Sequence, residues 1–168
     1  MVKGGAMWRI RPLKTYESMG QESTKATIYA GTFPRSLDAK KRVAIPSAWI
    51  TGEGDEFHVA PHPRERMLMI MREEELGKWE QKFQESRLAP QEKRRAIRAF
   101  YASARAVSAD KQGRILLPEA HCEWAQLDGD VVFIGSPGRM EIWSVQNYQA
   151  NEPADRSALQ AAADESGL

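Results

Sequence analysis

The chain has 168 residues, with 24 Lys and Arg side chains against 23 Asp and Glu, and a formal net charge of +1. The length fits about one domain. The balanced charge excludes a protein that coats nucleic acid by bulk charge, so any polyanion binding needs a local basic patch. The longest apolar runs, 67–71 and 131–134, are far shorter than the roughly 18 residues of a membrane span. A single cysteine, Cys122, excludes an internal disulfide and fits a reducing compartment.

The two ends of the chain differ from its middle in charge. Residues 1–28 carry five basic side chains against two acidic ones, and residues 151–168 carry one against four. Neither end shows sustained apolar periodicity, and no apolar segment of a secretory signal follows the first basic residues. We therefore expect a mobile basic extension at 1–28 and an acidic tail at 149–168, with a short helix only at 159–163. The basic extension either adds phosphate contacts or is a solvated tail.

An internal repeat relates two parts of the chain at a shift of 72 residues. Residues 36–46 align with residues 108–118, and each segment contains Asp, three further residues, Arg, three apolar residues and Pro. Two shorter matches follow, 54–59 with 129–134 and 67–70 with 140–143. Halves of about 45 residues bury little surface alone, so we expect them to pack on each other as a pseudo-dimer within one chain.

Each repeat begins with residues suited to a tight turn. Asp38 and Asp110 fit its first position, where the carboxylate accepts backbone N–H groups. Gly113 stands where a left-handed residue closes a short hairpin, and its counterpart in the first half is Lys41. A non-glycine residue in that conformation costs about 1 kcal/mol. The first hairpin therefore either tolerates local strain or uses another turn.

Strands flank these turns, and helices separate the two halves. The predicted strands are 43–46, 57–60, 67–72, 115–118, 131–135 and 140–144. A helix is expected at 73–88, which opens with three acidic residues, and a second one begins at Pro90. The apolar stripe of the second helix, which comprises Ile97, Phe100, Tyr101 and Ala104, is most simply core, and its basic residues a solvated face.

The sequence contains no catalytic constellation. His58 and His62 are four residues apart, but the prolines around His62 disrupt the helix that would align them on a metal. His121 and Cys122 are adjacent, so their side chains diverge, and no glycine-rich phosphate loop is present. We expect no enzyme, no metal and no cofactor. A hydrolase that uses the first two histidines is the remaining enzymatic alternative.

The turns carry a local excess of positive charge. The candidate DNA-binding residues are Arg35, Lys40, Lys41 and Arg42 at the first turn and Lys111 and Arg114 at the second, with Arg105 upstream as further charge. A two-stranded ribbon fits the major groove of B-DNA, and an Arg just after a turn directs a planar donor fork at guanine or phosphate. Alternatively, each Arg pairs with the Asp of its own turn and clamps it. One turn can also be clamped while the other reads DNA.

These residues resemble the MraZ family, which belongs to the AbrB-like, swapped-hairpin group of DNA-binding proteins. The resemblance rests on the repeated Asp-x-x-x-Arg motif, on residues 90–95 between its copies and on residues 141–143 near the end. It implies an α+β fold of two tandem AbrB-like modules, at 29–76 and 105–148, that form an intrachain pseudo-dimer barrel. A helical connector at 77–104 lies between the two modules.

The resemblance also implies a function. Family members are transcriptional regulators that form ring-shaped homo-oligomers and bind direct repeats in the promoter DNA of the division and cell-wall gene cluster, so a cytoplasmic, nucleoid-associated protein is expected. By this resemblance Lys40, Lys41 and Arg42 contact DNA, and Asp38 shapes the turn. By the same resemblance Arg114 contacts DNA, stabilises the fold or lies in a subunit interface. Family members commonly have Gly where this chain has Lys41. No membrane or small-molecule substrate is expected. The alternative is an AbrB-like protein-interaction or antitoxin-type module without promoter specificity.

Overall fold

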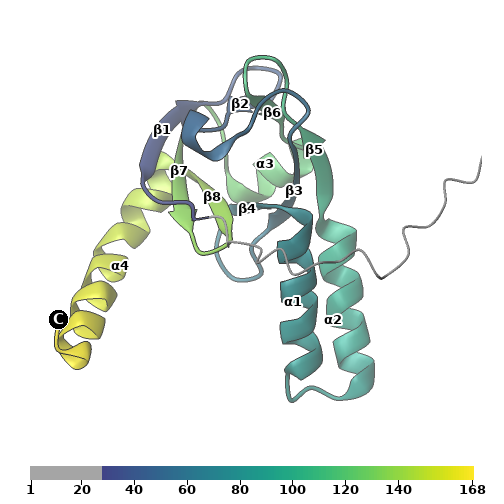
Figure 1. Ribbon diagram of the computed structural model, residues 1–168, viewed down its shortest axis with the longest axis vertical. Coiled ribbons are helices and arrows are strands. Elements are labelled where there is room, and N and C mark those ends of the chain that lie inside the picture. Colours follow the sequence, from purple (N-terminus) through teal and green to yellow (C-terminus); the bar gives the residue numbers. More distant parts are fainter. Residues whose placement is uncertain (1–27) are drawn as a thin grey trace, which may run out of the picture.

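The computed structural model describes residues 28–168, so all of the expected basic extension except Ile28 lies outside the described residues. In this part of the chain the fold is α+β. It comprises an antiparallel sheet of six strands, a separate two-stranded ribbon and four α-helices (Figure 1).

The six predicted strands and the predicted helix pair are all present, and three further elements, at 32–36, 105–108 and 119–125, were not predicted. The strands are β1 (Thr32–Ser36), β2 (Arg42–Ala44), β3 (Glu56–Pro61), β4 (Leu68–Met71), β5 (Arg105–Ser108), β6 (Arg114–Leu116), β7 (Asp130–Ser136) and β8 (Arg139–Ser144). The helices are α1 (Glu73–Glu85), α2 (Pro90–Ser103), α3 (Glu119–Ala125) and α4 (Val145–Ser166), with a 3-10 turn, η2, at Ser47–Trp49. The large sheet has the order β1-β7-β8-β4-β3-β5, and β2 pairs with β6.

Strand pairing repeatedly joins the first sequence half to the second. β1 pairs with β7, β5 with β3, and β2 with β6, all antiparallel. At the centre of the sheet, β4 of the first half pairs with β8 of the second. The strands on either side of each turn therefore pair with strands of the other half. Neither half completes its sheet without the other.

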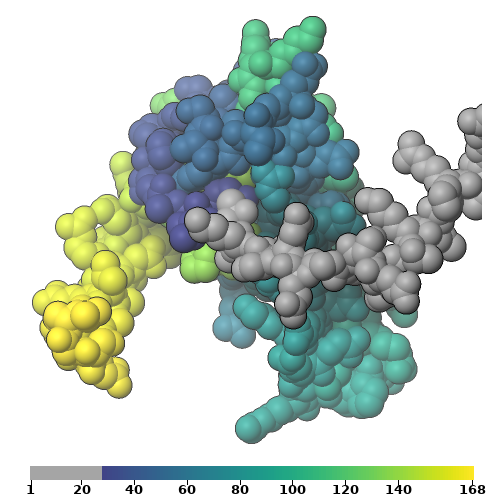
Figure 2. Space-filling view, in the orientation of Figure 1, coloured from purple at the N-terminus to yellow at the C-terminus, as the bar shows by residue number. Residues whose placement is uncertain are grey.

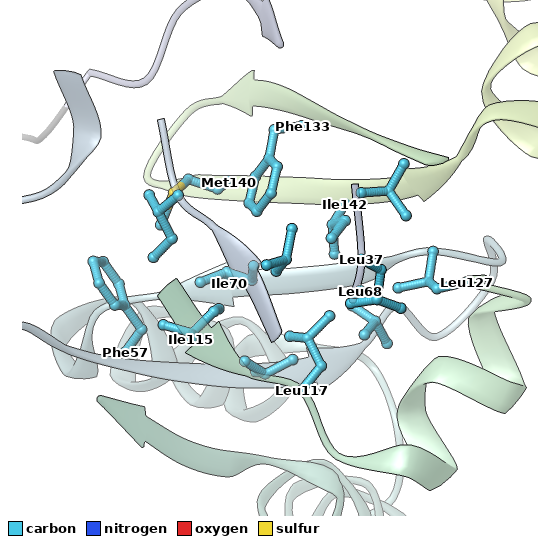
Figure 3. Close-up of a cluster of buried hydrophobic side chains, with 14 of the residues drawn as sticks. Leu37, Phe57, Leu68, Ile70, Ile115, Leu117, Leu127, Phe133, Met140 and Ile142 are labelled. Carbon is cyan, nitrogen blue, oxygen red and sulfur yellow. The ribbon is translucent and has the colours of Figure 1, made fainter. Parts of the chain in front are cut away.

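The main core lies between the large sheet and the β2–β6 ribbon (Figure 3). Phe57, Leu68, Phe133 and Ile142 of the sheet and Ile115 of the ribbon are all fully buried. Side chains alternate between the faces of a strand, and a second cluster covers the other face of the sheet. Its members are Met69, Met71 and Trp143 of the strands and Leu76 and Phe100 of α1 and α2. Tyr101, predicted to belong to the core stripe, is 43% exposed.

The hydrogen bonds correct the predicted alignment of the two halves. Leu37 and Ala109 occupy equivalent positions, and their amides donate to the carbonyls of Gly129 and Asp55, respectively. Asp55 therefore corresponds to Gly129, and the predicted match of Asp55 to Asp130 is wrong by one residue. The same correction applies to β4 and β8, because a one-residue slip would match core-facing side chains with side chains on the opposite face.

The C-terminal segment differs most from its prediction. α4 extends over Val145–Ser166, so the expectation of a tail with helix only at 159–163 is wrong. The Ser144 hydroxyl caps the helix by accepting a hydrogen bond from the Asn147 amide at 3.1 Å. Only the first turns of α4 pack against the sheet, and the remainder extends away from the body (Figure 1). Weak apolar periodicity and an internal Pro153 hide this helix in the sequence.

Candidate nucleic-acid interface

The two Asp-x-x-x-Arg segments fold into turns with the same backbone. We call residues 38–42 turn 1 and residues 110–114 turn 2. In turn 1 the Lys41 amide donates to the Asp38 carbonyl, and the Asp38 amide donates to the Arg42 carbonyl, both at 3.0 Å. The corresponding bonds in turn 2 measure 3.0 and 2.9 Å. The two turns therefore share one pattern of backbone hydrogen bonds.

The carboxylate of each aspartate accepts hydrogen bonds from the backbone and from the arginine of its own turn. Asp38 Oδ1 accepts from the amides of Lys40 and Arg42 at 2.9 and 2.8 Å, and Oδ2 accepts from Arg42 Nε at 2.7 Å. Asp110 makes the same three bonds with Gln112 and Arg114, each at 2.9 Å. The Arg42 amide is the strongest influence that lowers the pKa of Asp38, and the Arg114 amide acts likewise on the pKa of Asp110. Both carboxylates are therefore ionised at neutral pH.

Both arginines pair with the aspartate of their own turn, so the clamping alternative describes both turns. The side chains of Arg42 and Arg114 nevertheless remain 34% and 30% exposed. Each guanidinium uses its Nε for the ion pair, and within residues 28–168 its two Nη groups make no hydrogen bond. Because a guanidinium is planar, fixing Nε also fixes the direction of the Nη donors. The clamp is therefore compatible with a contact to DNA.

Turn 1 keeps this geometry although it lacks glycine. Lys41 has a φ of 63°, close to the 73° of Gly113 in turn 2. The first of the two expected alternatives is therefore correct, and the turn holds Lys41 in the left-handed region. Such a residue costs about 1 kcal/mol relative to glycine. The sequence places a cation at the position with the strained backbone.

Both turns lie at one end of the molecule, opposite the free ends of α1 and α2 (Figure 1), and the green atoms of turn 2 project from the surface in Figure 2. The Lys41 carbonyl accepts from the Leu117 amide at 2.8 Å, and the Gly113 carbonyl accepts from the Ile45 amide at 3.0 Å. Each turn is thereby held by a strand end of the other half. Lys40 and Lys111 are exposed on these projections.

A groove of about 540 Å³ lies beside turn 1. Lys40 and Lys41 line it together with Arg105 of β5, which the sequence had counted only as charge upstream of turn 2. The place of Arg105 beside turn 1 follows from the pairing of strands between the two halves, and a prediction of that pairing could have revealed it. Arg35 lies elsewhere, in a groove between β1, β7 and α4, and its Nη1 donates to the Pro34 carbonyl at 2.8 Å.

The structure does not bring the histidines and the cysteine together into a catalytic or metal-binding site. Within residues 28–168 no group of three or more His, Cys, Asp or Glu side chains could hold a metal ion. His62 Nδ1 accepts from the amides of Arg64 and Glu65, and burial lowers the pKa of this imidazole. Burial also raises the pKa of the Cys122 thiol, which makes it a poor nucleophile at neutral pH. No helix in the same part of the chain is long and apolar enough to cross a membrane.

Comparison with known proteins supports the resemblance carried by the turns. A family model described as "MraZ protein, putative antitoxin-like" matches residues 100–167, which include turn 2 and all of α4. The protein named transcriptional regulator MraZ from Desulforamulus reducens is 32% identical over 136 residues, which cover 80% of this chain and 95% of the relative. The same-named protein from Natranaerobius thermophilus is 33% identical over 82% of this chain and 96% of its own length. The same-named protein from Clostridium acetobutylicum is 32% identical over 84% of this chain and 100% of its own length. Relatives similar over nearly their whole length show that this chain belongs to the MraZ family of transcriptional regulators.

Proposed function

We propose that this protein is a sequence-specific DNA-binding transcriptional regulator that binds direct repeats in promoter DNA as a ring-shaped homo-oligomer. The observation that carries the proposal is the pair of turns at one end of the molecule. Both turns are held by an internal aspartate, and each carries an exposed lysine, Lys40 in turn 1 and Lys111 in turn 2. The MraZ names of the relatives agree with this function.

The crossing strands support a specific version of the fold. The β1–β7, β3–β5 and β2–β6 ladders each combine the two halves, as expected for two swapped-hairpin modules that form a pseudo-dimer. We assign the modules to 29–76 and 105–148 and the helical connector to 77–104. Residues 149–168 continue as the outer part of α4, which is acidic. This interlacing gives the turns a rigid base, which limits the conformational entropy lost when they bind.

The DNA contacts are assigned to the cations of the turns. Lys40, Lys41 and Arg42 form the principal set, because the two lysines have no ion pair within residues 28–168 and Arg42 keeps both Nη groups without a hydrogen bond there. Lys111 and Arg114 of turn 2 complete the basic surface at this end of the molecule, and Arg35, in its separate groove, is assigned a peripheral DNA contact. A local cluster of cations can bind DNA even though the net charge of the chain is nearly neutral, since contacts to phosphates depend on nearby cations rather than on the total charge of the protein.

Ring assembly gives such small turns sufficient affinity. A single turn buries little surface and binds weakly, whereas several turns on one ring meet evenly spaced repeats at a high effective concentration. The gain in apparent affinity is on the order of 10²–10⁴. The target in this proposal is the promoter of the division and cell-wall gene cluster, and the protein acts at the nucleoid in the cytoplasm.

Selection of bound sequences from random duplex DNA tests this function. The expected result is a short motif that recurs at a fixed spacing. The apparent affinity for a repeat duplex should fall steeply with salt, with a log–log slope of about −0.9 for each phosphate neutralised. Light scattering on the purified protein should give several chains per particle. Recovery of random sequences, or an affinity that does not change with salt, would contradict the proposal.

One observation favours a second function. The matching family model carries the words "antitoxin-like", and α4 offers a long exposed helix for a partner. A protein-interaction or antitoxin-type module would bind a partner protein and show no sequence preference in the selection experiment. A stable complex with a co-purified protein, together with unselective DNA binding, would support this alternative.

A further inference from the structure

The groove beside turn 1 is built from both halves of the chain. Lys40 and Lys41 of turn 1 border it on one side, Arg105 borders it from the start of β5, and Leu116 contributes a side chain that is 58% exposed. The bond from the Leu117 amide to the Lys41 carbonyl holds turn 1 against this groove. Within residues 28–168 none of the three cations takes part in an ion pair.

Arg105 is held in a defined position. Its Nη1 donates to the carbonyls of Ala102 and Ala104 at 2.7 and 2.9 Å, at the end of α2, where a helix carries partial negative charge. Its Nε and Nη2 groups make no hydrogen bond within the described residues. A guanidinium restrained in this way loses little freedom when it binds a ligand. Glu119 also borders the groove, but one carboxylate leaves a positive excess beside three cations.

The corresponding place beside turn 2 has different chemistry. At the repeat shift of 72 residues Arg105 corresponds to Phe33, whose ring lies 4.9 Å from Trp49 in an edge-to-face contact. Gln112 and Gly113 replace the two lysines of turn 1. The residues that make the first groove basic are therefore apolar or neutral in the second. At the same shift Lys111 corresponds to Ala39 and Arg35 to Val107, so the repeat preserves the turn but not the arrangement of the cations beside it.

We propose that Lys40, Lys41 and Arg105 form one phosphate-binding site for the DNA backbone, so that each chain holds the backbone mainly through turn 1. This inference rests on the proposed DNA-binding function and adds a contact from the second half of the chain. Lys and Arg donors are the usual partners of backbone phosphates. The exposed Leu116 supplies an apolar contact for a deoxyribose beside the bound phosphate.

The experiment compares single-charge variants on a fluorescent duplex that contains the repeat recovered by selection. Arg105→Gln removes one cation from the groove. Arg94→Gln removes the same charge from an exposed site on α2, eight residues before Ala102 and about 12 Å along the helix. Arg105→Lys keeps the charge. Fluorescence anisotropy at several salt concentrations gives the affinity and the salt slope, and thermal unfolding shows whether each variant retains its fold.

For Arg105→Gln we expect about tenfold weaker binding and a salt slope reduced by about one, as for the loss of one phosphate contact. Arg94→Gln should bind like the unaltered chain, and Arg105→Lys should retain the slope. Equal losses for Arg105→Gln and Arg94→Gln would reveal a general charge effect and overturn the proposal. A less stable Arg105→Gln variant with an unchanged slope would identify Arg105 as a helix cap only and also overturn it. An unaltered chain that binds no repeat duplex refutes the proposed function itself, which separates the two failures.

Discussion

In turn 1 the left-handed position is occupied by Lys41, and the neighbouring strand supplies Arg105. In turn 2 the same two positions are occupied by Gly113 and Phe33. The backbone bonds and the Asp–Arg pair are nevertheless the same in both turns. The aspartate therefore determines the shape of the turn, and the other positions are free to vary in charge. Turn 1 combines backbone strain with additional cations, as expected of a site shaped by function at some expense of stability.

The largest difference between turn 1 and turn 2 is expected when the arginine of each turn is replaced. Arg42→Ala should abolish repeat-specific binding, with a loss of about 100-fold or more, because every chain of a multivalent assembly loses the same contact. Arg114→Ala should weaken binding much less. Gel shifts with repeat DNA measure both, and circular dichroism should show both variants folded. Similar affinities for the two folded variants would mean that the turns contribute equally.

A second difference between the halves concerns an ion pair near the turns. Asp55 accepts two hydrogen bonds from Arg72, at 2.6 and 2.9 Å, and these bonds lower the pKa of Asp55 to about 2. Its counterpart in the second half is Gly129. Since the folded pKa lies below the unfolded value near 3.8, this contribution to stability is present above about pH 4 and disappears as the pH falls toward 2.

Asp55→Asn should therefore lower the free energy of unfolding by about 1 to 2 kcal/mol at neutral pH, with a smaller difference near pH 2. Urea unfolding at both pH values measures the effect. Asp130→Asn, at the residue that the sequence alignment had matched to Asp55, is the control and should change stability less. Equal effects of the two substitutions at both pH values would show that the ion pair with Arg72 adds no stability of its own.

The lysines at the tips of the turns provide a matched pair of charge changes. Lys40→Gln should weaken binding to the repeat duplex about tenfold and reduce the salt slope by about one. Lys111→Gln removes an equivalent exposed charge from turn 2 and should change the slope less. Anisotropy titrations over a range of salt concentrations distinguish them. A larger change of slope for Lys111→Gln would reverse the assignment of turn 1 as the principal contact.

The smallest expected effect concerns the left-handed position itself. Lys41→Gly should raise the free energy of unfolding by up to about 1 kcal/mol, because glycine adopts this φ without strain. The reverse change, Gly113→Lys, should lower the free energy of unfolding by a similar amount, because the lysine takes on the backbone strain. No steric cost is added, since a Cβ there meets only Ile50 Cδ1, at an ordinary 3.7 Å. Chemical denaturation measures both variants. Lys41→Gly should also weaken DNA binding, so that stability and affinity change in opposite directions.

The sequence was most informative where a short motif determines local geometry. The Asp-x-x-x-Arg repeats predicted both turns, because a carboxylate two and four residues before backbone amides can bind them without help from the rest of the fold. Six strands and the helix pair followed from apolar periodicity and from Pro90, whereas β1, β5 and α3 were not predicted. α4 was missed, since a largely exposed helix leaves no apolar pattern to read.

By itself, the sequence determined the repeat, the two turns and the cations that they carry, because these depend on residues within a few positions of one another. Only the tertiary structure decided which strands pair, which residues of the two halves correspond and which cations share a groove. Arg105 joins Lys40 and Lys41 because β6 of one half pairs with β2 of the other. Such pairing is set by burial of a core that the two halves share, and this long-range contribution to the free energy of folding cannot be read from local spacing.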